Sequence, residues 1–133
     1  MKKLITVLLL TLLIPATSFA GFENGNTLLA RCTTTKAETL YYQEQARCLA
    51  YISGISDAHN TFVAWGYMEP RFCLPNSVTR DQLEKIVVKY LNENPEKLHF
   101  TAASSINNAL YGAFPAPYRD DGTRYCPDEG ESK

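Results

Sequence analysis

The sequence lacks a basic region, because 13 lysines and arginines stand against 14 aspartates and glutamates in 133 residues, with a net charge of −1. No stretch concentrates the positive charge, which argues against nucleic acid and anionic membrane surfaces as partners. Alternating apolar and polar patterns of useful length are also missing, so strands are not expected. The one long apolar run, Leu4–Ile14, is too short for a comfortable membrane span.

Residues suited to catalysis or metal binding are few. Asp57 and one of the two histidines, His59, stand two positions apart on a predicted helix, where their side chains point in different directions. His59 instead falls on an apolar face, where we expect a hydrogen-bonded core or groove histidine. The cysteines lack the Cys-x-x-Cys spacing of zinc sites, and the acidic residues of the C-terminal tail match no calcium-binding loop. We therefore expect no catalytic residue, no cofactor and no metal.

The first 20 residues have the layout of a secretory signal peptide. Two lysines precede the apolar run, and the small-residue ending Ser18-Phe19-Ala20 predicts cleavage after Ala20. A retained N-terminal anchor helix is the alternative. Cleavage would leave Gly21–Lys133, 113 residues with a net charge of −3, which suits one small domain.

All four cysteines lie in this mature part, and an even count in a small exported chain indicates two disulfides. Four cysteines allow three pairings, and the sequence alone does not choose among them. We favour Cys32–Cys48, which would join two consecutive helices. The second bridge would then be Cys73–Cys126, which would tie the proline-rich tail to the loop after the longest helix. Each bridge could contribute about 3–4 kcal/mol in the loop-entropy description.

The longest predicted helix starts around Glu38–Tyr41 and ends near Gly66. Its apolar positions recur at steps of four and three, and other apolar residues flank them, so we expect a central helix that is apolar over much of its girth. The main stripe consists of Cys48, Ile52, Ile55, His59 and Phe62. Gly54 lies mid-helix, where glycine costs about 1 kcal/mol relative to alanine, and predicts the close approach of a neighbouring helix.

Three shorter helices are expected beside it. One covers Thr27–Cys32, and the next follows the N-cap Thr79, with Gln82 completing a capping box. The last starts at Asn94-Pro95 and ends at Gly112–Pro115. The predicted fold class is therefore all-α, a small disulfide-stapled bundle of about four helices over residues 21–115. An irregular C-terminal tail follows at 116–133, and we expect its end, 128–133, to be disordered.

Aromatic and charged residues cluster after the longest helix and again in the tail. Tyrosine, tryptophan and arginine are enriched at protein-binding hot spots, so these two segments are candidate contact surfaces. We expect Trp65 and Phe72 to cap the core instead. The predicted partner-binding residues are Tyr67, Glu69 and Arg71, with Tyr118 and Arg119 as second choices.

Several spaced motifs together resemble the Rap/Tai immunity proteins of type VI secretion, which protect against amidase effectors. They are Asn24-Gly25-Asn26-x-Leu28-Leu29-x-x-Cys32, Cys48-x-x-Tyr51-Ile52-x-Gly54-x-x-Asp57, Phe72-Cys73-x-Pro75, Gln82-Leu83-x-x-Ile86-Val87-x-x-Tyr90-Leu91-x-x-Asn94-Pro95-Glu96, His99, Ala102, Ala109-Leu110 and Ala113-Phe114-Pro115. The resemblance covers about Asn24 to Pro115. Members often read Phe-Pro-Cys at the end, whereas Ala116 follows Pro115 here, and Cys126 would take over the role of that cysteine.

The resemblance implies a periplasmic helical protein, not an enzyme, that neutralises a toxin injected by neighbouring cells. The implied partner is a peptidoglycan amidase with a Cys–His active site, whose cleft the immunity protein occludes, in some members as a homodimer. Two other functions remain open. A periplasmic acid-stress chaperone should carry a lysine-rich terminus, whereas this tail is acidic. A small secreted hydrolase would require His59, Asp57 and His99 to converge.

Overall fold

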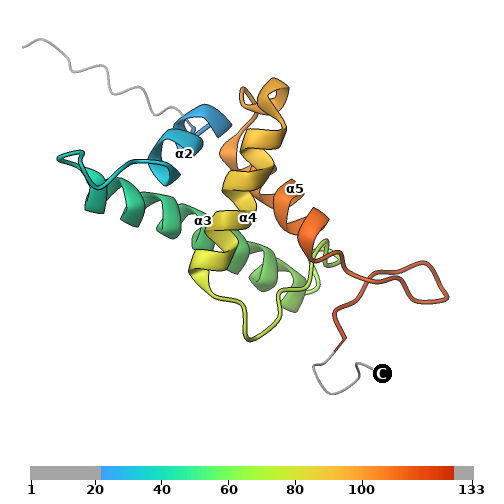
Figure 1. Ribbon diagram of the computed structural model, residues 1–133. Coiled ribbons are helices and arrows are strands. Elements are labelled where there is room, and N and C mark those ends of the chain that lie inside the picture. Colours follow the sequence, from blue (N-terminus) through green and yellow to red (C-terminus); the bar gives the residue numbers. More distant parts are fainter. Residues whose placement is uncertain (1–21, 128–133) are drawn as a thin grey trace, which may run out of the picture.

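The computed structural model describes residues 22–127, which fold into a bundle of helices (Figure 1). The elements are α2 (Gly25–Cys32), α3 (Tyr41–Ala64), α4 (Arg80–Glu93), the 3₁₀ turn η1 (Pro95–Lys97) and α5 (Ala102–Ala113). Within these residues there is no strand, only three isolated bridges, so the all-α prediction is confirmed. The predicted signal peptide and the predicted disorder of 128–133 lie outside the described residues.

The long helix α3 buries a single stripe along one side. Its buried residues are Cys48, Ile52, Ser56 and His59, at steps of four, four and three. Phe62, which would continue the stripe, is 45% exposed. Helices α2, α4 and α5 all contact α3, but other helices do not cover its whole girth as predicted, because Ala58, Phe62 and Trp65 are exposed.

The core lies where this stripe meets the other three helices. Each element contributes through a short apolar repeat, and Phe72 joins them from the loop after α3. The largest fully buried side chains are Phe72, Leu28, Ile52, Leu91, Ile106, Leu110, Val87 and Cys48. A modest core of this kind is typical of a domain of about 100 residues, for which disulfides add useful stability.

Close backbone approach occurs at a different glycine from the one predicted. A Cβ at Gly54 would meet nothing within 4 Å, so that prediction is wrong. A Cβ at Gly25 would lie 2.9 Å from the carbonyl oxygen of Leu98 and 3.0 Å from its Cα. The backbone N–H of Gly25 donates to the Phe100 carbonyl at 3.0 Å, and that of Asn26 donates to the Leu98 carbonyl at 3.1 Å. The start of α2 is thus docked on the segment that precedes α5.

This docking explains why the predicted helix from Pro95 onward is broken. The chain forms only the turn η1 and restarts at α5, with the side chain of Thr101 accepting from the Ser104 N–H at 3.3 Å as the N-cap. The carbonyls of Leu98 and Phe100 turn toward α2 and are not used in a continuous helix. The prediction of one helix over this range is wrong, although its end at Ala113 is confirmed.

The start of α4 follows the predicted capping box. The Gln82 N–H donates to Thr79 Oγ1 at 3.2 Å, and the Thr79 N–H donates to Gln82 Oε1 at 2.8 Å. Satisfying two otherwise unpaired donors in this way fixes the first turn. Asn24 caps α2 through a similar reciprocal pair with Thr27.

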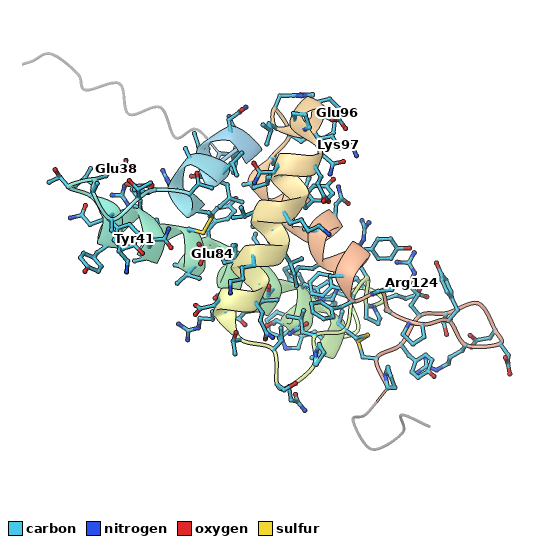
Figure 2. The ribbon with its side chains drawn as sticks, in the orientation of Figure 1. Glu38, Tyr41, Glu84, Glu96, Lys97 and Arg124 are labelled. Atoms are coloured by element: carbon cyan, nitrogen blue, oxygen red, sulfur yellow. A yellow bond between two sulfur atoms is a disulfide. The ribbon has the colours of Figure 1, made fainter. Side chains whose placement is uncertain are left out.

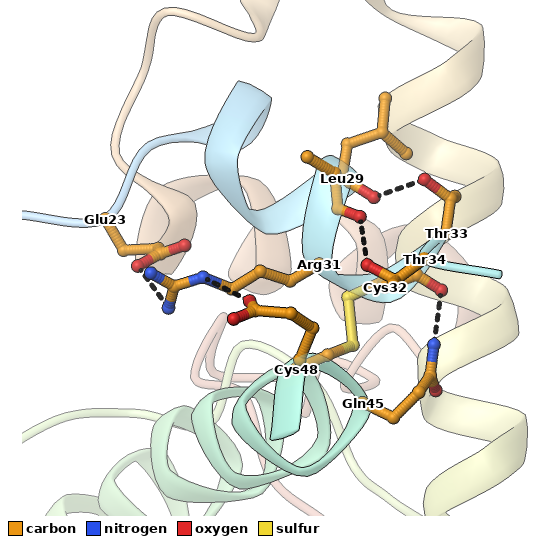
Figure 3. Close-up of a disulfide and its surroundings, with 10 residues drawn as sticks. Glu23, Leu29, Arg31, Cys32, Thr33, Thr34, Gln45 and Cys48 are labelled. Carbon is orange, nitrogen blue, oxygen red and sulfur yellow. Dashed lines mark hydrogen bonds and ion pairs between the residues drawn. A yellow bond between two sulfur atoms is a disulfide. The ribbon is translucent and has the colours of Figure 1, made fainter. Parts of the chain in front are cut away.

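The structure contains the two disulfides favoured from the sequence, so none of the four cysteines is free in the described part of the chain. Cys32–Cys48 is buried between α2 and α3 (Figure 3). Beside it, Arg31 contacts the carboxylates of Glu23 and Glu44 at 2.9 and 3.2 Å. Disulfide and ion pairs together hold α2 against the N-terminal half of α3.

Candidate partner-binding surface

Helix α3 ends in a Schellman motif that turns the chain into an exposed loop. Gly66 has a φ of 73°, a left-handed conformation that glycine adopts without steric strain. The Gly66 N–H donates to the Val63 carbonyl at 3.0 Å, and the Tyr67 N–H donates to the Phe62 carbonyl at 2.9 Å. These two bonds fix the direction in which Tyr67 leaves the helix.

Three aromatic rings form an exposed cluster at this helix end. The ring centroids of Phe62 and Trp65 are 6.2 Å apart, those of Phe62 and Tyr67 6.3 Å, and those of Trp65 and Tyr67 5.7 Å. Trp65 is 63% exposed and Tyr67 is 74% exposed. The prediction that Trp65 caps the core is wrong, whereas Phe72 is fully buried as predicted. We call Phe62, Trp65 and Tyr67 the aromatic cluster.

The loop after the cluster is fastened to the core through His59. Nε2 of His59 accepts the backbone N–H of Arg71 at 3.0 Å. Its ring stacks on Phe72 with centroids 3.9 Å apart and planes 16° from parallel. The hydrogen-bonded buried histidine predicted from the sequence is confirmed. Burial and the nearby positive charge of Arg71 lower the pKa of His59, partly offset by its hydrogen bond to Asn60.

The loop also pairs with the segment that follows α5. The Cys73 N–H donates to the Phe114 carbonyl at 2.9 Å, and the Ala116 N–H donates to the Arg71 carbonyl at 3.1 Å. The Cys73–Cys126 disulfide adds a covalent link between the same two parts of the chain. The start of the tail therefore lies beside the loop.

Residues 118–124 form a hairpin-like turn. The Arg119 N–H donates to the Thr123 carbonyl at 2.8 Å, and Gly122 has a φ of 84°. The Thr123 hydroxyl and N–H both donate to Asp121 Oδ1, at 2.6 and 2.9 Å. These bonds favour the ionised carboxylate and lower the pKa of Asp121.

Arginine and tyrosine side chains alternate from the loop across α5 to the tail. Arg71 lies 5.5 Å from the ring centroid of Tyr111, and Arg124 lies 5.8 Å from the same ring. Arg124 also lies 5.2 Å from the Tyr118 ring, and its Nε donates to the Tyr118 hydroxyl at 3.0 Å. The Arg124 N–H donates to Glu69 at 3.3 Å. Figure 2 shows Arg124 at the point where the tail passes α5.

This arrangement brings the two predicted groups of partner-binding residues onto one surface. Tyr67, Arg71, Tyr118 and Arg119 are exposed. Glu69 is exposed as well, but its carboxylate already holds the tail, and Arg119 lies against Tyr125 rather than Tyr111. We call the aromatic cluster together with these five residues the loop–tail surface.

Sequence reasoning missed Phe62 and Tyr111. The apolar stripe of α3 continues to Phe62 in sequence although the packed part of the stripe ends at His59. No sequence pattern near His59 marks the end of the packed part, because that end depends on where the neighbouring helices stop. No sequence pattern distinguishes Tyr111 from the other residues of α5. Only the fold brings its ring between Arg71 and Arg124.

A groove of about 470 Å³ adjoins the loop–tail surface, between α3 and α5. Ile55, Ala58, Phe62 and Met68 give it an apolar side, and α5 lines it with small and amide side chains. His59 and Arg71 are the ionisable residues in its lining. The groove shares Phe62 and Arg71 with the loop–tail surface.

The structure keeps Asp57, His59 and His99 apart from one another. Asp57 is exposed while His59 is buried, so the two do not form an acid–base pair. His99 is exposed beside Phe100, after η1, on a different segment from His59. No group of three or more metal-ligating residues occurs among the described residues. Of the helices described, none has the length and apolar character that a membrane crossing requires.

The fold is that of a small all-α protein linked by two disulfides. The chain belongs to the Rap1a immunity protein family, which matches residues 24–116. The match spans α2 to α5 and ends before the tail residues Tyr118, Arg119 and Arg124. A comparison with curated proteins gives no match. Membership supports a role in toxin immunity through binding of a cognate effector, and such families are generally non-enzymatic.

Proposed function

We propose that this protein is exported to the periplasm and there occludes a toxin injected by a type VI secretion system. The toxin class that fits best is a peptidoglycan amidase, the partner that the sequence resemblance implies. Family membership supports immunity as the role. Export is supported by the leader-like first 20 residues and by two disulfides, which form and persist in oxidising compartments.

The observation that carries the proposal is the preformed loop–tail surface. Trp65, Tyr67 and Tyr118 are 63%, 74% and 60% exposed, an unusual concentration of large aromatic side chains on a small domain. A capped helix end, a disulfide and the Arg–Tyr contacts hold them in place without a partner. Preorganised aromatic and arginine side chains lose little conformational entropy on binding, which is what a tight inhibitor needs.

The test is binding of the mature, oxidised chain to a peptidoglycan amidase effector of a type VI secretion system, measured by calorimetry. Substituting a hot-spot residue by alanine typically costs 2 kcal/mol or more, roughly a thirtyfold loss of affinity. We expect at least this loss for the double variant Tyr67→Ala, Arg71→Ala. The matched control is Tyr42→Ala, since Tyr42 is 82% exposed near the opposite end of the same helix.

Circular dichroism must show that each variant is folded before affinities are compared. A folded Tyr67→Ala, Arg71→Ala variant that binds as tightly as wild type would place the interface elsewhere. Protection of cells against the effector should follow the measured affinities. Some members of the family that the sequence resembles act as homodimers, and light scattering of the free protein and of the complex measures the oligomeric state directly.

A further inference from the structure

The contacts of His59 define its protonation state. A backbone N–H can only donate, so Nε2, which accepts from Arg71 at 3.0 Å, must carry a free lone pair. The ring proton is then on Nδ1, which donates to Asn60 Oδ1 at 3.1 Å. Both nitrogens are thus used in the neutral ring, and 5% of the residue is exposed.

A proton added at Nε2 would point at the Arg71 N–H, where two donors cannot share a hydrogen bond. The surroundings of His59 do not compensate the added charge. From the loop it faces Arg71, a positive residue, and from α5 it faces the uncharged side chains of Ser104, Asn107 and Asn108 across the groove. On α3 itself, Asp57 is exposed on another side of the helix.

We propose that His59 is a positioning residue that holds the loop of Tyr67 and Arg71 only while its imidazole is neutral, so that mild acid releases the loop and weakens partner binding. This inference rests on the proposed function, because the loop carries part of the surface proposed to bind the toxin. At Arg71, the bond to His59 is the side-chain hydrogen bond that ties the loop backbone to α3, whereas at Tyr67 the backbone is held by the Phe62 carbonyl.

The direction of the effect follows from the contacts. Burial and Arg71 lower the pKa of His59 below its ordinary value of 6.5. The held loop therefore binds fewer protons than the released loop, and its stability is complete above about pH 6.5. It is lost progressively as the pH falls from there through the lowered pKa of His59. Between these two pKa values, the ratio of held to released loop should fall by up to about tenfold per pH unit, and it levels off below the lowered pKa. The apparent affinity falls with the fraction of protein that has a held loop.

The first test needs no partner. Trp65 is the only tryptophan, and its ring contacts Tyr67, so its fluorescence reports on the loop. NMR titration of the two histidines of the free protein gives the midpoint of His59, with His99 as an internal reference. We expect the Trp65 fluorescence to change at the His59 midpoint while far-UV circular dichroism keeps its helical signal.

Two substitutions complete the design. His59→Gln keeps an uncharged acceptor toward Arg71 and should abolish the acid transition of Trp65 fluorescence. The matched control His99→Gln should leave the transition unchanged. Fluorescence that stays flat while His59 titrates would overturn the proposal. So would an unchanged transition in His59→Gln, or loss of the helical signal at the same pH, since the last result would make His59 a residue of the global fold. If His59→Gln does not fold, the wild-type protein alone still tests the proposal. The midpoint of the Trp65 fluorescence change must then coincide with the NMR midpoint of His59.

The partner arm uses the effector from the binding test, titrated between pH 7.5 and pH 5. Wild type and His99→Gln should lose affinity on acidification, and His59→Gln should lose much less. Equal losses in all three proteins would overturn the proposal. If the effector fails to bind even at pH 7.5, the proposed function is wrong, whereas the fluorescence test still decides whether His59 positions the loop.

Discussion

Replacing each cysteine pair by alanine separates what the two disulfides contribute to stability. The bridges close 16 residues between Cys32 and Cys48 and 53 residues between Cys73 and Cys126. The entropy lost by the unfolded chain then corresponds to about 3 and about 4 kcal/mol, respectively. On loop length alone, loss of the Cys73–Cys126 bridge should be the more damaging change.

The folded structure reverses this order. Beyond Ala116, the tail contacts the rest of the molecule mainly through Arg124, at Glu69 and Tyr111. These exposed contacts are worth about 1 kcal/mol together. A tail freed over the ten residues from Ala116 to Cys126 regains entropy of about 2.7 kcal/mol in the same description. Removing the bridge thus stabilises the folded protein as well as the unfolded chain, though by less. The free energy of unfolding therefore falls by only about 2.5 kcal/mol.

Removing the Cys32–Cys48 bridge frees no segment of the folded protein, because both residues are buried between α2 and α3. Its removal should cost the full 3 kcal/mol or so, plus on the order of 1 kcal/mol for the space left by the buried sulfurs. Urea unfolding followed by circular dichroism measures both variants against wild type. We expect Cys32→Ala, Cys48→Ala to be the less stable protein. If Cys73→Ala, Cys126→Ala is less stable instead, the tail is an integral part of the fold and the reasoning fails.

Other substitutions test single contacts. Gly25→Ala should destabilise the protein by about 1–3 kcal/mol, because the new Cβ would press on the backbone of Leu98. Gly54→Ala is its matched opposite and should stabilise by up to about 1 kcal/mol, since open space surrounds that helix position. Thr79→Ala should cost about 1 kcal/mol through loss of the capping bond to Gln82. Urea midpoints measure all three, and equal effects of the two glycine substitutions would contradict the packing at Gly25.

Features encoded by neighbouring residues were predictable from the sequence. The Thr79–Gln82 box needs only a four-residue pattern, and the structure forms both of its bonds. The favoured pairing Cys32–Cys48, which the structure contains, joins two helices that are consecutive in the chain. In such cases the energetic reason for the structure lies within a few residues of the pattern that reveals it.

Features decided by distant partners were not predictable. The break between η1 and α5 exists because Leu98 and Phe100 give their carbonyls to α2, more than 70 residues earlier. Phe62 follows the same apolar pattern as the packed part of α3, but it is exposed. The outer limit of a core depends on tertiary contacts, so helical periodicity alone misplaced this part of the surface.

The tail disulfide should act on binding as well as on stability. In Cys73→Ala, Cys126→Ala the free tail is favoured over the ordered one by about 1.7 kcal/mol, the regained entropy less the lost contacts. A partner that contacts Tyr118 or Arg119 must order the tail again, so its apparent affinity should fall about twentyfold. Calorimetry with the effector measures this loss, and Cys32→Ala, Cys48→Ala serves as the control at a temperature where circular dichroism shows it folded. The control should bind as wild type does, because its bridge lies away from the loop–tail surface. An unchanged affinity of the tail variant would exclude Tyr118 and Arg119 from the interface and leave binding to the aromatic cluster and Arg71.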